Sequence, residues 1–161
     1  MGWSEAWSPM PKNWIEHTKQ LIERHGIDAQ ILEHKDWGKE SQTVAKALGV
    51  PVANILKALL CFSDGEPLLA MILGDDRLEL GKLEMLLHAD VRLGRAKELK
   101  SLGFTVGGIP AIGSGLRTFV DTKVLQKEFV IGSAGSPYVG IRLKPSDLVK
   151  LNGAIVADLA K

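Results

Sequence analysis

Apolar residues recur at helical spacing in five stretches of the chain. The first stretch runs from Pro11 to Gly26, and a proline near the start with a glycine after the end is typical of an amphipathic helix. In the second stretch, Ser41 is placed to cap a helix that Gly49 and Pro51 would stop. The remaining predicted helices span residues 78–88, 96–102 and 145–151.

Two further stretches, residues 55–62 and 68–73, are almost uninterrupted apolar runs. The Asp64-Gly65 pair between them predicts a β-hairpin whose two strands are largely buried. Because helices and strands do not alternate regularly, the pattern favours an α+β fold with a curved, mixed, largely antiparallel sheet and flanking helices. Shorter strands are predicted at residues 27–33, 91–93, 117–121, 128–131 and 138–143.

Size and composition indicate an ordinary globular protein. The chain has 161 residues, of which 45% are hydrophobic and 24% charged. We expect a single domain over residues 1–161, with the tryptophan-containing residues 1–26 forming a helical extension. No apolar run reaches the roughly 18 residues of a membrane span, and the N-terminus lacks the features of a secretory signal. A cytoplasmic protein without a membrane partner is therefore expected.

The net charge of +1 limits the expected contact with nucleic acid. A protein that wraps a phosphate backbone is usually much more basic, so we expect no DNA partner and only local contact with one end of an RNA. Residues 92–100 are the most basic segment, but Glu98 interrupts it, and we interpret it as a solvated helix face.

Several catalytic motifs are absent from the sequence. It contains no phosphate-binding P-loop and no G-x-S-x-G nucleophile motif. The four histidines are scattered and there is one cysteine, so we expect neither a metal site nor a cofactor. Cys61 lies in the most apolar stretch, where a buried and unreactive thiol is expected. His88 closes a predicted helix, where it complements the helix dipole.

Lys57 is the only charged residue within the apolar run of residues 55–62. An ammonium group on a buried strand is costly unless it meets an anion, a carbonyl or water. Strand alternation places Lys57 on the face of Ile55, Leu59 and Cys61. Two interpretations are equally good: an edge-strand lysine that prevents aggregation, or a cleft lysine that binds a phosphate or polarises an ester carbonyl.

Two segments rich in small residues are candidate binding loops. Residues 106–115 contain four glycines and a proline, and residues 132–136 lie between two predicted strands. Glycine lets a backbone approach a ligand closely and present N–H groups to an anion. The simpler interpretation of each segment is a turn.

Seven short motifs along the chain are similar, in sequence and in order, to those of a known family. The motifs are residues 45–51, 55–59, 74–80, 106–110, 118–121, 132–135 and 143–148. Together they resemble the YbaK/ProX family of aminoacyl-tRNA deacylases, which includes the editing domain inserted in bacterial prolyl-tRNA synthetases. The likeness extends over roughly residues 28–155.

The resemblance implies a mixed α/β fold with a curved sheet and a pocket for the charged 3′ end of tRNA. The family's essential strand lysine falls on Lys57, which is thus the expected catalytic residue. The expected substrate-binding residues come from the two glycine segments: Gly107, Gly108, Ile109, Pro110, Gly113, Gly132, Ser133 and Gly135.

The expected reaction is hydrolysis, in trans, of the 3′-terminal ester of a mischarged aminoacyl-tRNA. The expected specificity follows only from the resemblance, which favours tRNA-Pro carrying alanine or cysteine, with an aminoacyl-tRNA synthetase as a partner. Two alternatives stay open, a non-catalytic tRNA-binding or regulatory module of the same fold and a hydrolase of other small acyl esters. The sequence departs from the family at Ala111, where proline is common, which leaves the shape of the loop open.

Overall fold

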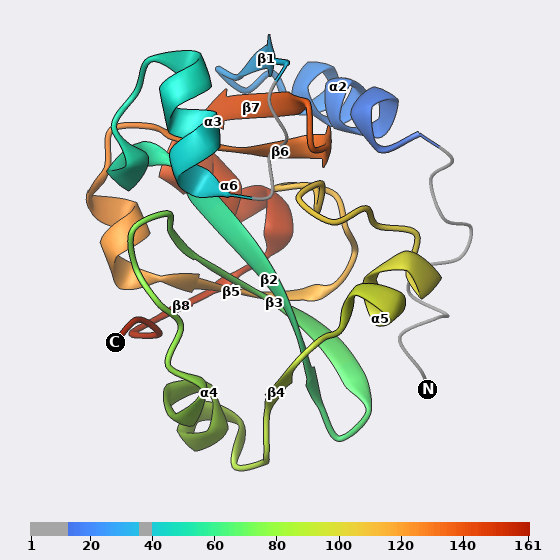
Figure 1. The fold of residues 1–161 in the computed structure, drawn as a ribbon, viewed down its shortest axis with the longest axis vertical. Helices are drawn as coiled ribbons and strands as arrows, with labels where there is room; N and C mark the ends of the chain where they lie inside the picture. The colour runs from blue at the N-terminus through green and yellow to red at the C-terminus, as the bar shows by residue number, and fades with distance from the viewer. Residues whose placement is uncertain (1–12, 36–39) are drawn as a thin grey trace.

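The computed structural model describes residues 13–35 and 40–161 and has an α+β fold, as predicted (Figure 1). A first sheet has the strand order β1-β7-β6, and its neighbouring strands are antiparallel. Its strands are β1 (Gln30–Glu33), β6 (Val130–Ser136) and β7 (Val139–Leu143).

A second sheet has the order β4-β2-β3-β5-β8 and is mixed. Strand β2 is antiparallel to β3 and β4, whereas β5 is parallel to both β3 and β8. Most pairings are antiparallel, but the strands form two sheets rather than the one expected. The strands are β2 (Leu56–Ser63), β3 (Glu66–Leu73), β4 (Arg92–Leu93), β5 (Arg117–Asp121) and β8 (Ile155–Ala157).

The β2–β3 hairpin forms where the sequence predicts it. Ser63 pairs with Glu66, which leaves a two-residue loop. Asp64 and Gly65 have φ angles of 52° and 76°. Positive φ at both loop residues matches the right-handed twist of the flanking strands, which explains why an Asp-Gly pair forms this turn.

Helices lie close to their predicted positions, with two differences at their starts. The first helix has Asn13 at its N-cap, where the side chain accepts the Glu16 N–H, while Pro11 lies outside the described residues. Ser41 is the first residue of its helix rather than the cap, which is Glu40. The helices are α2 (Trp14–His25), α3 (Ser41–Leu48), α4 (Leu80–Leu87), α5 (Ala96–Ser101) and α6 (Pro145–Asn152), with short 3-10 turns η1 (Val52–Asn54) and η2 (Thr122–Gln126).

Residues 132–136 do not form the predicted turn. They belong to strand β6, which continues to Ser136, and the turn to β7 follows at Pro137 and Tyr138. Glycine is required at two positions of β6 because neighbouring groups occupy the space that a side chain there would need. A register shift between Ser133 and Ser136 marks an irregularity in the pairing with β7.

The hairpin of β2 and β3 separates two parts of the core. One part lies between the two sheets, where Leu56, Leu60 and Met71 pack with residues of β6 and β7. The other lies on the opposite face, where Cys61 and Ile72 pack with α4 and β5. Helix α2 packs against β6, and the buried Thr18 donates its hydroxyl hydrogen to the Ala134 carbonyl at 3.0 Å.

Candidate functional site

The two sheets meet at one point and then separate. Ile55, just before β2, forms a parallel bridge with Ile131 of β6. Beyond this bridge β6 turns to a different partner, because Ser133 bridges to Pro110 and its carbonyl accepts the Ala111 N–H at 2.8 Å. The space left between β2 and the 107–111 segment is a cavity of about 330 Å³, which is within the range of small-molecule sites.

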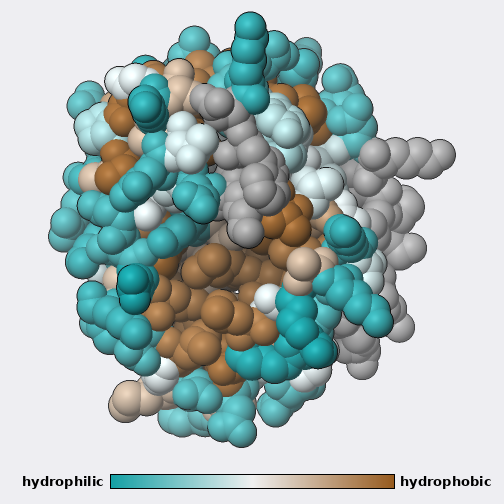
Figure 2. Space-filling model, in the orientation of Figure 1, coloured by the Kyte–Doolittle hydropathy of each residue, from teal (hydrophilic) through white to brown (hydrophobic). Residues whose placement is uncertain are grey.

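The cavity wall is mostly apolar and carries little charge. Among the described residues that line it, none is aspartate or glutamate, and Lys57 is the only lysine or arginine. Figure 2 shows an apolar hollow on the face of the molecule viewed in Figure 1, in the region framed by α3, α4 and α5. Such a wall suits a small, weakly polar group, whose orientation must be fixed by hydrogen bonds.

Gly132 lies where the two sheets separate, and its missing side chain shapes the cavity. A Cβ at this position would lie 2.9 Å from the Ala111 Cβ and 3.3 Å from the Leu56 Cδ2. No side chain fits there without displacement, so glycine is what allows β2, β6 and the 107–111 segment to approach one another.

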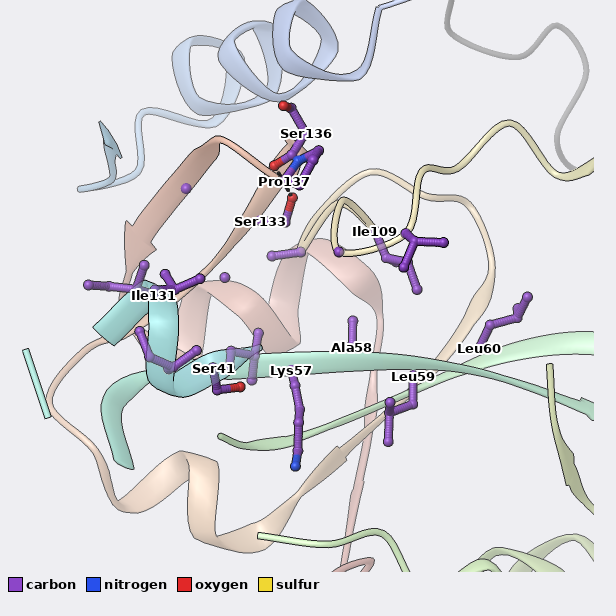
Figure 3. A pocket seen from close by; sticks show the side chains of 18 of the residues that line it. Ser41, Lys57, Ala58, Leu59, Leu60, Ile109, Ile131, Ser133, Ser136 and Pro137 are labelled. Atoms are coloured by element: carbon purple, nitrogen blue, oxygen red, sulfur yellow. Dashed lines mark hydrogen bonds between the residues drawn. The ribbon is translucent and has the colours of Figure 1, made fainter. Parts of the chain in front are cut away.

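Lys57 lies on the predicted face of its strand. Its neighbours on that face, Leu59 and Cys61, pack in the core next to α4. Figure 3 shows that the side chain leaves β2 on the side opposite to Ala58, away from Ile109 and Ser133. The structure therefore does not bring the Lys57 ammonium together with the glycine segments inside the cavity.

The Lys57 ammonium is held by the turn that follows β3. Its Nζ donates a hydrogen bond to the Asp76 carbonyl at 2.5 Å. Partial burial lowers the pKa of Lys57, and the negative charge of Asp76 opposes this effect. The Asp76 carboxylate also lies 3.5 Å from the Lys123 ammonium. The Lys57 ammonium is thus held by the turn after β3 rather than free in bulk solvent.

Four of the predicted substrate-binding residues line the cavity, namely Gly107, Ile109, Gly132 and Ser133. The other four, Gly108, Pro110, Gly113 and Gly135, do not. Pro110 bridges to Ser133, and the Gly108 N–H donates to the Thr105 carbonyl at 2.9 Å. Their positions show that the glycine segments build the wall of the cavity without all of their residues facing it.

The remaining two glycines face helix α2. A Cβ on Gly113 would lie 2.6 Å from the Leu21 Cδ1, and one on Gly135 would lie 2.2 Å from the Trp14 Cβ. The Gly135 N–H donates to the Ser133 hydroxyl at 3.0 Å, so it is not free for a ligand. These two glycines therefore allow α2 to pack closely against the rest of the protein.

The cavity is also lined by polar residues that are not among the predicted site residues. Ser41, at the start of α3, and Ser136, at the end of β6, both line it. His34 lines it too, and its buried Nδ1 has no hydrogen-bond partner among the described residues. These residues come from separate elements, and no local sequence signal indicates that they meet.

Three further features concern Cys61, possible metal ligands and the length of the helices. Cys61 is fully buried, as predicted, and burial raises the pKa of its thiol to about 12. In residues 13–35 and 40–161, no group of three or more His, Cys, Asp or Glu residues could hold a metal ion. None of the described helices has the length and apolar character needed to cross a membrane.

Comparison with known proteins identifies relatives of the chain. A family model for the aminoacyl-tRNA editing domain matches residues 35–151. The proline–tRNA ligase of Oleidesulfovibrio alaskensis is 33% identical over 96 residues, which are 57% of this chain and 17% of the ligase. The ligase of Finegoldia magna is 29% identical over 125 residues, which are 75% of this chain and 21% of the ligase. The chain thus corresponds to a small part of these enzymes.

A solved structure described as a candidate trans-editing enzyme for prolyl-tRNA synthetase shares the whole fold. It is 28% identical, superposes with a TM-score of 0.83, and is matched over 94% of this chain and 99% of its own. The family model covers most of the chain, including β2, the 107–111 segment and β6. The chain therefore belongs to the aminoacyl-tRNA editing domain family, of the YbaK/ProX type.

Proposed function

We propose that this protein hydrolyses the 3′-terminal ester of mischarged aminoacyl-tRNA in trans, with tRNA-Pro carrying alanine or cysteine as substrate. The observation that carries the proposal is the cavity between β2 and the 107–111 segment. It is apolar, narrow at Gly132 and bordered by backbone. The matched segments of the relatives lie within proline–tRNA ligases, which supports a prolyl-tRNA synthetase as the partner that supplies the mischarged tRNA.

The proposed reaction is attack of water on the ester carbonyl carbon. The oxygen of water bonds to that carbon, the bond from the carbon to the ribose oxygen breaks, and a proton passes to the ribose oxygen. The products are the free amino acid and tRNA with a free terminal hydroxyl. A neighbouring ribose hydroxyl orients the water, and backbone N–H groups of the cavity wall stabilise the developing oxyanion.

Fewer backbone N–H groups are available to the oxyanion than the sequence implies. Gly108 and Gly135 use their N–H groups within the protein, and pairing with β7 directs the Gly132 N–H away from the cavity. Gly107 lines the cavity with a φ of 78°. Gly132 instead limits the size of the cavity because it has no side chain. Pocket size discriminates only weakly between amino acids that differ by one methylene, so the dimensions of the cavity must be set closely.

Lys57 supplies positive charge at the rim of the cavity. Its ammonium lies across β2 from Ile109 and Ser133, where it suits the phosphate of the terminal nucleotide better than the ester carbonyl inside. A lysine ammonium binds phosphate as a point charge and can exchange the Asp76 carbonyl for it.

The proposal is tested by incubating the purified protein with alanyl-, cysteinyl- and prolyl-tRNA-Pro and measuring released amino acid. Release from the first two, with prolyl-tRNA-Pro spared, supports the proposal. Binding of tRNA without release would instead identify a non-catalytic module. Hydrolysis of simple acyl esters without action on tRNA would identify a different hydrolase.

Lys57→Ala is expected to reduce the rate of deacylation by about 100- to 1000-fold, which is the typical effect of losing one electrostatic donor. Lys57→Met keeps the length of the side chain without its charge and should lose as much activity. Lys57→Arg should recover part of it. If Lys57 only anchors the turn at Asp76, both neutral variants would lower the melting temperature and keep near-normal rates in the folded fraction.

A further inference from the structure

Strand β2 has an edge inside the cavity that no other described strand pairs with. It pairs with β3 along its whole length, but on its other side it pairs with β4 only at Cys61 and Phe62. On that same side, the bridge to β6 is confined to Ile55. Between these two contacts, no strand of the described chain covers residues 57–59.

Hydrogen bonds at both ends of β2 show which backbone groups point to this edge. The Ile55 carbonyl accepts the Gly74 N–H on the β3 side, and the Leu60 carbonyl accepts the Gly94 N–H, at 2.7 Å, on the opposite side. In an antiparallel ladder, alternate residues direct both N–H and C=O to the same neighbour. Ala58 therefore directs its N–H and its C=O to the free edge.

The cavity lining supports this geometry independently. Five consecutive residues of β2, from Leu56 to Leu60, line the cavity. Their side chains alternate between the two faces of the sheet, as Figure 3 shows for Lys57, Ala58 and Leu59. Consecutive residues of a strand can all line one cavity when the cavity lies along their shared backbone edge.

An aminoacyl ester carries the groups that such an edge recognises. Its amino group and its carbonyl belong to one residue, as do the N–H and C=O of a residue in a strand. No described carboxylate lines the cavity to pair with the amino group, so a backbone carbonyl is the available acceptor. A free strand edge binds extended backbone through its N–H and C=O groups.

We propose that the aminoacyl group docks on Ala58 as a single residue of an added antiparallel strand. Its amino group donates to the Ala58 C=O, and its ester carbonyl accepts the Ala58 N–H, which stabilises the oxyanion during hydrolysis. This inference rests on the proposed deacylase function and specifies how that site holds its substrate.

The docking geometry selects the configuration of the amino acid. Residues directly opposite one another in an antiparallel pair project their side chains from the same face. The side chain of an L-amino acid would therefore point with that of Ala58 toward Ile109, and that of a D-amino acid toward the face of Leu59. Ile109 thus limits the size of the accepted L-side chain.

The substrate half of the pairing is tested with wild-type protein on alanyl-tRNA-Pro and on propionyl-tRNA-Pro, which lacks only the amino group. Each enzymatic rate is divided by the rate of spontaneous hydrolysis of the same ester, because the amino group also activates the ester. The normalised rate should be about 10- to 100-fold lower for propionyl-tRNA-Pro, as for loss of a charge-assisted hydrogen bond. D-Alanyl-tRNA-Pro should be slow as well. Equal normalised rates for all three esters would overturn the pairing.

The protein half is tested by replacing Ala58 with L-lactic acid, which exchanges the N–H for an ester oxygen. Hydrolysis of alanyl-tRNA-Pro should fall about 100- to 1000-fold. The matched control is the corresponding replacement of Ser146 by L-glyceric acid. Ser146 is exposed in the first turn of α6 and does not line the cavity, and its N–H has no partner within the helix. Normal activity of a folded Ala58 variant would contradict the inference.

The two proposals fail in different ways. If wild-type protein hydrolyses none of the mischarged tRNAs, the proposed function is wrong. If the wild type is active but neither the missing amino group nor the missing N–H slows it, the function stands and the edge pairing is wrong. If the Ala58 variant does not fold, the comparison of the three esters decides.

Discussion

Gly132 carries a tight steric constraint in the wall of the cavity. In Gly132→Ala the added Cβ would meet the Ala111 Cβ at 2.9 Å, which should force β6 and the 107–111 segment apart. Overpacking of this kind costs about 1–3 kcal/mol. Urea denaturation should show this loss of stability, and deacylation should fall because the narrow end of the cavity is filled.

The double variant Gly132→Ala/Ala111→Gly separates this contact from other effects. Removing the Ala111 methyl restores the space that the new methyl needs, so the double variant should be more stable than Gly132→Ala. The coupling energy from the double-mutant cycle measures the contact itself. Additive changes in stability would show that the Ala111 contact is not the cause.

Lys57 illustrates what residue-level reasoning can predict. Strand alternation correctly places it with Leu59 and Cys61, because a period of two follows from backbone geometry alone. The position of the cavity does not follow from it, since that depends on Ile131, more than seventy residues later, pairing with Ile55. The sequence therefore predicts the direction of the side chain and not its distance from the glycine segments.

At the level of elements, the strongly patterned segments and most of the short strands are predicted well, whereas the end of β6 and strand β8 are not. The β2–β3 hairpin has long apolar runs around an Asp-Gly turn, and both signals act locally. The glycines of β6 indicate a turn, but Gly132 and Gly135 lie in the strand. Glycine is needed there because Ala111 and Trp14 occupy the space that a side chain would take. Nothing in the sequence pattern predicts β8, whose three residues include the exposed Ile155 and Val156.

Helix α4 ends in a backbone conformation that favours glycine. Its C-cap, His88, is exposed and has φ 53° and ψ 41°, a left-handed geometry that is unfavourable for residues with a Cβ. His88→Gly should therefore raise the free energy of unfolding by about 0.5–1 kcal/mol. Thermal unfolding checks this, with His88→Ala as a control that keeps the Cβ. If the alanine variant is stabilised equally, the imidazole and not the backbone is the source of strain.

On the scale of the whole molecule, the distribution of charge favours a local contact with tRNA. The net charge is only +1. Segment 93–100 borders the cavity through Leu93, Gly94 and Leu99, and Lys97 and Lys100 on the same segment are exposed. Arg92 and Arg95 both pair with Glu98, at 2.8 and 3.4 Å, and these bonds hold the pKa of that carboxyl at about 2.

This arrangement leads to a prediction about tRNA binding. Lys97 and Lys100 lie on the same segment as Leu99, which lines the cavity. Their positive charges should therefore attract the phosphates next to the 3′ end. Lys97→Glu/Lys100→Glu should raise the KM for aminoacyl-tRNA while leaving kcat close to normal, because neither side chain lines the cavity. Each lost phosphate contact should also weaken the dependence of binding on salt, by about 0.7–0.9 in the slope of log K against log salt.

The control is Lys150→Glu/Lys161→Glu, which changes the net charge equally with two exposed lysines that do not lie on this segment. If both double variants raise the KM by the same factor, overall charge rather than the position of the lysines governs association. If only the first pair acts, tRNA approaches over α5. That direction would lead the 3′ end past Leu93 and Gly94 to the free edge of β2, which is the path that the proposed docking at Ala58 requires.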